Sequence, residues 1–193
     1  MTRAWDPFDH PDRSAEKAGE RIRLNEIRAS CVEALRREFG DDFFGGFERT
    51  EYASKNYREF LLPDDACSRK ENYAKLLGAY PICVTTRGLH GSIGWKLGEY
   101  LAFSKAIVSE RISHELPGEF AEGRNFLGFD NTDECVTATR QLFADAGLRS
   151  RMMLQNRFYY SNHVEPAAAI RASLDLAIPG WQARRPSFGS ELP

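Results

Sequence analysis

The sequence predicts an α/β fold, a Rossmann-like three-layer sandwich with a mainly parallel sheet. Three short apolar runs, 82–85, 106–109 and 125–129, predict its strands. A glycine-rich loop and an amphipathic helical pattern separate the first two runs, and another helical pattern follows the third. Strands that alternate with helices in this way form parallel sheets through βαβ units.

Length and composition suit one ordinary domain. We expect it to span 1–178, with 179–193 as an extended or disordered tail that holds three of the nine prolines. A net charge of −2 argues against wholesale binding to nucleic acid or to acidic membranes. With no apolar run of about 18 residues and no signal-peptide pattern, the predicted localisation is cytoplasmic.

The potential metal ligands are scattered along the chain. The four cysteines are widely spaced, form no Cys-x-x-Cys pair and read as reduced thiols. The four histidines show no ligand spacing either, so we predict no metal.

The first half of the chain is expected to begin with a long helix. Ser14 is a plausible N-cap and Gly40 a plausible end. Between them, apolar residues recur three or four apart: Leu24, Ile27, Cys31, Leu35 and Phe39. A short strand is expected at 42–47, 51–62 is ambiguous, and Ser68 is expected to cap a helix over 69–78.

The second half is expected to hold a helix at about 94–103 and a turn at Pro117-Gly118. Asn131 and Glu134 resemble a capping box that starts a helix through about Ala144. Extra C-terminal helices are predicted near 148–162 and 166–177. Five aromatic residues are expected in the core: Trp95, Tyr100, Phe103, Phe126 and Phe129.

The glycine-rich loop carries Gly88, Gly91 and Gly94 at intervals of three. It matches neither the dinucleotide fingerprint nor the phosphate-binding P-loop, so the bare pattern is weak. Its position between a buried strand and a helix start favours an anion site, because ligands of open α/β sheets bind at strand ends. The backbone N–H groups of Gly91, Ser92, Ile93 and Gly94 would contact phosphate. The alternative is a merely tight turn.

Two charged residues follow the loop on one face of the predicted helix. Lys96 and Glu99 lie three residues apart. Lys96 would meet a phosphate, and Glu99 would accept hydrogen bonds from ribose hydroxyls. The alternative is a surface ion pair of well under ~1 kcal/mol.

Further polar residues flank the same region. For Arg87 there are two interpretations: it binds a diphosphate bidentately, or it is a solvated loop residue. His90 would donate a hydrogen bond to a sugar or phosphate. Arg3 would point to the same crevice if residues 1–4 end a strand there, and is otherwise part of an exposed terminus. Three carboxylates near the next strand, on an irregular segment without predictable separation, do not predict acid–base catalysis: Glu110, Glu115 and Glu119.

The segment from Gly88 to Ala102, followed by Lys105-Ala106-Ile107-Val108, resembles the donor-binding half of GT-B glycosyltransferases. In that superfamily a helix carrying Glu-Ala-Met-Ala precedes a strand reading Pro-Val-Val. Here Glu99-Tyr100-Leu101-Ala102 and Ala106-Ile107-Val108 occupy those places. The resemblance covers most of the chain and is most specific over 84–135.

The resemblance implies a nucleotide-diphosphate sugar, with UDP or GDP, as donor substrate and no cofactor. Glu99 would hold the ribose, and Lys96, Arg87 and Arg3 are the diphosphate candidates. Many members have a second glutamate eight positions before the helix one. Gly91 stands there in this chain, which fits a divergent branch related to the spore-maturation CgeB-like proteins.

Sugar transfer in this superfamily also needs an N-terminal acceptor domain. Residues 1–7 resemble the end of the first donor-domain strand, as though the chain begins partway through that domain. We therefore expect donor binding, with transfer only if a partner supplies the missing half, and we assign no catalytic residue. The alternative is a non-catalytic module that dimerises or binds a partner through its exposed inter-domain face. A phosphatase or kinase-like enzyme is disfavoured because the chain lacks a P-loop and a nucleophile elbow.

Overall fold

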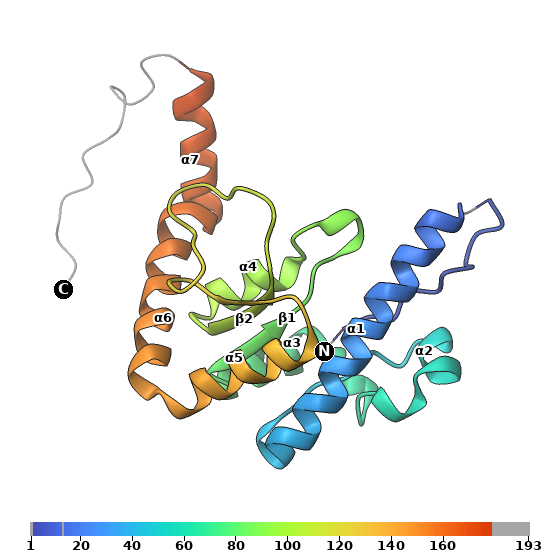
Figure 1. Ribbon diagram of the computed structural model, residues 1–193. Helices are drawn as coiled ribbons and strands as arrows, with labels where there is room; N and C mark the ends of the chain where they lie inside the picture. Colours follow the sequence, from blue (N-terminus) through green and yellow to red (C-terminus); the bar gives the residue numbers. More distant parts are fainter. Residues whose placement is uncertain (1, 13, 179–193) are drawn as a thin grey trace.

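The computed structural model describes residues 2–12 and 14–178, which form an α/β fold around a small, open, parallel sheet (Figure 1). Its strands are β1 (Ile82–Thr85), β2 (Ala106–Glu110) and β3 (Leu127–Phe129), in the order β1-β2-β3. Both pairings are parallel, with Ile82 opposite Ala106 and Val108 opposite Leu127. The predicted α/β class and its parallel sheet are confirmed.

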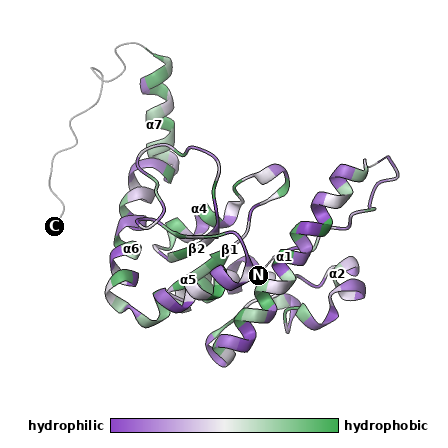
Figure 2. Ribbon diagram, viewed as in Figure 1, coloured by the Kyte–Doolittle hydropathy of each residue, from purple (hydrophilic) through white to green (hydrophobic). Residues whose placement is uncertain are grey.

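Apolar side chains cover both faces of the sheet, because successive residues of a strand point to opposite sides. Val108 packs against α1 (Ala15–Phe39) and α5 (Thr132–Ala144). Ile107 packs on the other face, against α3 (Lys70–Ala79) and α4 (Trp95–Ala102). Figure 2 shows hydrophobic colouring along β1 and β2. Helices packed on both faces of the sheet therefore hold its edge in place.

The first helix forms as predicted. Ser14 caps α1, its hydroxyl accepting a hydrogen bond from the Lys17 N–H at 3.3 Å. The helix ends at Gly40, whose φ of 52° lies in the region that glycine tolerates best. The long apolar stripe of α1 faces the sheet and α5.

The strand expected at 42–47 is wrong over most of its length. A 3-10 turn, η1 (Gly40–Asp42), occupies its start, and Phe47 alone makes parallel bridges, to Thr2 and to Leu61. Arg36 explains the interruption, because its guanidinium binds the carbonyl oxygen of Gly45 that a longer ladder would use. The ambiguous stretch 51–62 contains α2 (Glu51–Asn56) and the turn η2 (Arg58–Phe60).

The predicted cap at Ser68 is also wrong. Ser68 ends a separate 3-10 turn, η3 (Asp65–Ser68), which Asp64 caps by accepting from the Ala66 N–H at 2.8 Å. The chain re-enters a helix only after Arg69, so α3 begins at Lys70 without a side-chain cap.

The C-terminal half follows the prediction more closely. Asn131 caps α5 by accepting from the Glu134 N–H at 3.0 Å, and the Glu134 carboxylate accepts from the Asp130 N–H at 2.9 Å. The two extra helices are α6 (Ala146–Tyr159), which continues into a π turn, η5 (Tyr160–Val164), and α7 (Pro166–Ala177). Helix α7 extends away from the sheet (Figure 1). The predicted tail, 179–193, lies outside the described residues.

Two of the five aromatic residues expected in the core lie at the surface. Trp95 is 92% exposed because it is the first residue of α4, and Phe103 is 41% exposed just after the last turn of that helix. Tyr100, Phe126 and Phe129 are buried as predicted. Over the part of the chain that the structure describes, no helix is long and apolar enough to cross a bilayer.

Candidate functional site

The predicted site lies at the carboxyl ends of β1 and β2, where the loop after β1 leads into α4. This is the sheet edge at which open α/β sheets bind ligands. A cavity of ≈ 980 Å³ starts there and runs beneath β1. At the site end, it is lined by residues that the sequence singled out, Arg3, Gly88, Ser92, Ile93, Gly94 and Lys96, and by Arg28 and Glu48, which it did not.

The loop is closed by its own backbone. The Gly88 N–H donates to the carbonyl oxygen of Ser92 at 2.7 Å, and the Ser92 N–H donates to Leu89 at 3.1 Å. A Cβ on Gly88 would lie 2.5 Å from the Ser92 hydroxyl oxygen and 3.2 Å from the Ser92 carbonyl oxygen, so the close approach of Ser92 favours glycine there. Gly91 has a φ of 66°, which glycine adopts without strain. Two of the three loop glycines are therefore explained by folding alone.

Gly94 has no such structural reason. Its φ of −72° suits any residue, and a Cβ there would meet open space. It stands at the N-cap of α4 without a side-chain cap. Among the described residues, the N–H groups of Ile93, Gly94 and Trp95 have no hydrogen-bond partner. A ligand could therefore approach these donors and the positive end of the α4 dipole.

Lys96, in the first turn of α4, is partly buried and points into the cavity. Burial, and then the charge of the nearby Arg28 guanidinium, lower the pKa of its ammonium to about 8. Glu48 and Glu99 act in the opposite direction. The side chain stays cationic at neutral pH but loses its proton more easily than an exposed lysine.

Arg28, from α1, is a central residue that the sequence interpretation missed. It is 8% exposed, and its guanidinium donates to the Thr86 hydroxyl at 2.9 Å, to the Arg3 carbonyl at 2.9 Å and to the Arg87 carbonyl at 3.0 Å. Burial lowers its pKa, whereas the charge of Glu110 raises it. A signal was present, because buried polar residues recur along this face of α1 at helical spacing: Arg21, Asn25 and Arg28.

Glu99 lies one turn further along α4 and is exposed. Its carboxylate accepts a hydrogen bond from the Tyr73 hydroxyl of α3 at 2.8 Å. Burial, and then this bond, raise the pKa of Tyr73, so the phenol remains a donor. One carboxylate oxygen is thus anchored, which orients the group while leaving its other lone pairs accessible.

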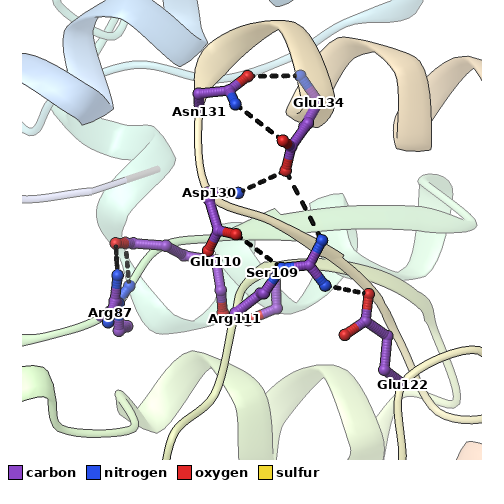
Figure 3. A network of polar contacts seen from close by, with 8 residues as sticks. All are labelled: Arg87, Ser109, Glu110, Arg111, Glu122, Asp130, Asn131 and Glu134. Carbon is purple, nitrogen blue, oxygen red and sulfur yellow. Dashed lines mark hydrogen bonds and ion pairs between the residues drawn. The ribbon is translucent and has the colours of Figure 1, made fainter.

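Arg87 is held by Glu110, the last residue of β2, as Figure 3 shows. Its side chain meets one oxygen of the Glu110 carboxylate at 2.7–2.8 Å, and its backbone N–H donates to the other at 2.9 Å. Glu110, which the sequence left among three unassigned carboxylates, is therefore the partner of Arg87. The pair fixes the start of the loop, and a diphosphate would have to compete with Glu110 for Arg87.

A second cluster in Figure 3 surrounds Arg111, the residue after Glu110. Its guanidinium contacts the carboxylates of Glu122, Asp130 and Glu134. The hydrogen bonds to Asp130 and then to Glu122 raise the pKa of Arg111. They join the end of β2 to β3 and α5, so they hold the edge of the sheet rather than present a cation to a ligand.

The remaining predicted residues are engaged elsewhere. The guanidinium of Arg3 lies over the Trp5 ring, 5.0 Å from its centroid, while its carbonyl reaches Arg28. His90 has a φ of 59°, and its backbone N–H and ring both face Glu20 of α1. The structure thus brings together Lys96, Arg28 and the amino end of α4. Arg87, His90 and Glu99 lie around them, and each of the three contacts a different residue.

No family model, curated protein or solved structure matches this chain. Within 2–12 and 14–178, no group of three or more histidine, cysteine, aspartate or glutamate side chains is placed to hold a metal ion.

Proposed function

We propose that this chain is the donor-binding half of a GT-B-type glycosyltransferase, and that it binds the diphosphate of a nucleotide sugar at the carboxyl edge of the sheet. The observation that carries the proposal is the meeting of two cations, Lys96 and Arg28, beside the open amino end of α4. Because the two charges repel each other, an anion placed between them would relieve that repulsion.

The order of the paired segments supports a Rossmann-like sandwich. The parallel bridges run from Leu61 to Phe47 to Thr2, and the sheet then runs β1-β2-β3. Numbered along the chain, the bridged segments run 3-2-1 and the sheet strands run 4-5-6, which are the two halves of the 3-2-1-4-5-6 order of a doubly wound sheet, although among the described residues no backbone pairing joins Thr2 to β1. Ligands of such a sheet bind where the order reverses. Arg28 joins Arg3 to Arg87 between these two halves, and this contact supports the proposal that the cationic pair serves a nucleotide site there.

Glu99 supplies the ribose contact in this proposal. Tyr73 anchors one of its oxygens at 2.8 Å, and the exposed carboxylate stands about one helical turn from Lys96. A carboxylate so oriented can accept hydrogen bonds from two neighbouring hydroxyl groups. The isolated chain would bind the donor without transferring sugar, because transfer requires an aligned acceptor and a water-poor cleft.

Calorimetric titration with UDP and with GDP tests the proposal. One nucleotide should bind saturably to the native chain, and Glu99→Ala and Lys96→Met should each weaken it at least tenfold, about 1.4 kcal/mol. Glu33→Ala and Lys17→Met change the same residue types at exposed positions of α1 and should leave the affinity unchanged. Absence of binding to a folded chain, or equal losses in the control variants, would overturn the proposal.

One observation favours the alternative, a non-catalytic interaction module. Trp95 is 92% exposed beside the site, and α7 carries the exposed side chains of Ile170 and Leu176. Figure 2 shows hydrophobic colouring along much of α7. Exposed apolar patches commonly mark protein contacts. Sedimentation at several concentrations separates the two functions, because a monomer that binds nucleotide argues against the module.

A further inference from the structure

Two cysteines from different helices meet in the core on one face of the sheet. Cys31 lies on α1 and Cys135 on α5, 4% and 0% exposed, and both belong to the apolar cluster between these helices and the sheet. Both are free thiols, and their side chains are hydrogen-bonded to each other. The nucleotide proposal leaves this pair unused.

The packing of the two helices places these cysteines opposite each other independently of that bond. The rings of Phe39 and Phe143 lie 5.4 Å apart, and each phenylalanine follows the cysteine of its helix by eight residues, just over two helical turns. Arg140 also binds Glu38 across the same two helices, at 2.6–2.7 Å. Helices α1 and α5 therefore run side by side in the same direction, and positions two turns before the phenylalanine pair lie opposite as well.

The two thiols differ in acidity. A hydrogen bond from Cys135 lowers the pKa of the Cys31 thiol, burial acts in the opposite direction, and a hydrogen bond from Thr132 lowers it further. The same bond between the cysteines, and then burial, raise the pKa of the Cys135 thiol. The thiolate is the nucleophilic form of cysteine, so Cys31 is the sulfur that reacts first, with Cys135 beside it to react second.

We infer that Cys31 and Cys135 form a redox-active dithiol, which hydrogen peroxide oxidises to a disulfide bridge between α1 and α5. The Cys31 thiolate attacks one peroxide oxygen, the O–O bond breaks, and the leaving hydroxide takes a proton to become water, which leaves Cys31 as a sulfenic acid. The Cys135 sulfur then attacks the Cys31 sulfur, and its proton leaves with the expelled hydroxide as a second water. Two thiols and one peroxide give one disulfide and two waters, and a dithiol such as dithiothreitol reverses the bridge by exchange.

The small size of the oxidant matters because both sulfur atoms are buried. Hydrogen peroxide is uncharged and little larger than water, so local opening between the two helices is enough to admit it. A disulfide holds its sulfur atoms at about 2.05 Å, so closing the bridge draws α1 toward α5. Arg28 lies three residues before Cys31 on α1, within one turn of the bridge, but the oxidation itself does not depend on the proposed nucleotide function.

The experiment treats the reduced full chain with an equimolar amount of hydrogen peroxide and maps the cysteines by mass spectrometry. The intact mass should fall by two hydrogens, and a tryptic digest should contain Cys31 linked to Cys135. Dithiothreitol should restore the two unlinked peptides. In urea, where the helices are lost, the yield of this linkage should fall at least tenfold, because the linkage depends on the folded packing of α1 against α5.

Variants locate the bridge. Cys31→Ala and Cys135→Ala should each abolish it, with folding verified by circular dichroism. Cys83→Ala, at a buried cysteine on the other face of the sheet, and Cys67→Ala, at a partly exposed one, should leave it unchanged. The inference is overturned if the folded native chain keeps all four thiols, if Cys31 proceeds to sulfinic acid without a bridge, or if the peroxide links Cys67 or Cys83 instead. A bridge that forms equally well in urea also overturns it, because the pairing would then reflect chance contact.

Discussion

The guanidinium of Arg28 donates a hydrogen bond to the backbone carbonyl of Arg3 at 2.9 Å, while its other terminal nitrogen donates to Arg87 at 3.0 Å. A single buried cation thus fastens the first residues of the chain to the loop after β1. The same side chain lies close enough to Lys96 to lower its pKa. Structure and proposed ligand binding therefore depend on one residue of α1.

Arg28→Met should lower the free energy of unfolding by about 2–4 kcal/mol, because it leaves three acceptors without their charged donor. Urea denaturation of both proteins measures the difference. Arg23→Met replaces an exposed arginine on the same helix and should stay within about 0.5 kcal/mol of the native chain. Equal effects of the two substitutions would mean that the contacts of Arg28 do not stabilise the fold.

Lys96 should give the chain a distinctive alkaline stability profile. Its folded-state pKa of about 8 lies below the ~10.4 of an exposed lysine. Between these values the unfolded chain holds more protons, so the free energy of unfolding should rise with pH, at most about 1.4 kcal/mol per unit. Urea denaturation at pH 7, 8, 9 and 10 should show this rise in the native chain relative to Lys96→Met. Parallel profiles would place the lysine in solvent.

The same ionisation should govern the proposed ligand. A diphosphate needs the Lys96 ammonium, so nucleotide affinity should fall as the pH rises from 7 to 9. The Lys96→Met variant should bind weakly with an affinity that does not change over this range. A native affinity that is independent of pH would separate Lys96 from the diphosphate.

The sequence predicted those parts of the site that follow from local spacing. The β1 strand, the loop and the α4 face with Lys96 and Glu99 are contiguous, and glycine positions and helical periodicity locate them. The identity of their partners was not predictable, because Tyr73 and Glu110 come from other elements and their contacts depend on packing. Arg87 was therefore treated as available when it is paired.

The N-terminal third was harder to predict for a different reason. The apolar stripe of α1 was predicted correctly, but the sequence interpretation assigned no role to the polar residues beside it, of which Asn25 and Arg28 are buried. Single-residue bridges at Thr2 and Phe47 leave no strand-length pattern in the sequence. Trp95 was expected in the core because it is a large aromatic residue. It is exposed instead, since a side chain at the first position of a helix can point to solvent.

Tyr73→Phe should weaken nucleotide binding about fivefold while it changes the free energy of unfolding by only about 1 kcal/mol. The hydroxyl contacts Glu99 at 2.8 Å, so its loss frees the carboxylate to rotate without opening the core. Calorimetry and urea denaturation measure the two effects, and Tyr80→Phe serves as the matched control. If Tyr73→Phe binds nucleotide as the native chain does, Tyr73 does not position Glu99.

Among the polar residues away from the site, we expect substitution of Asn156 to lower the free energy of unfolding most. Its fully buried amide donates to the carbonyls of Lys105 at 2.7 Å and Asn125 at 2.8 Å, and it accepts from the Asn125 side chain at 3.0 Å. Asn156→Leu would leave all three groups buried and unpaired, so unfolding should become easier by about 3 kcal/mol.

The loss should also be local, because the Asn125 side chain accepts from the Ala121 N–H at 3.0 Å and so fixes the turn before β3. Amide exchange at Ala121 should accelerate in Asn156→Leu, whereas Arg151→Leu, at an exposed position of α6, should change neither exchange nor stability. An unaltered Ala121 rate in the first variant would show that the turn is held without Asn156.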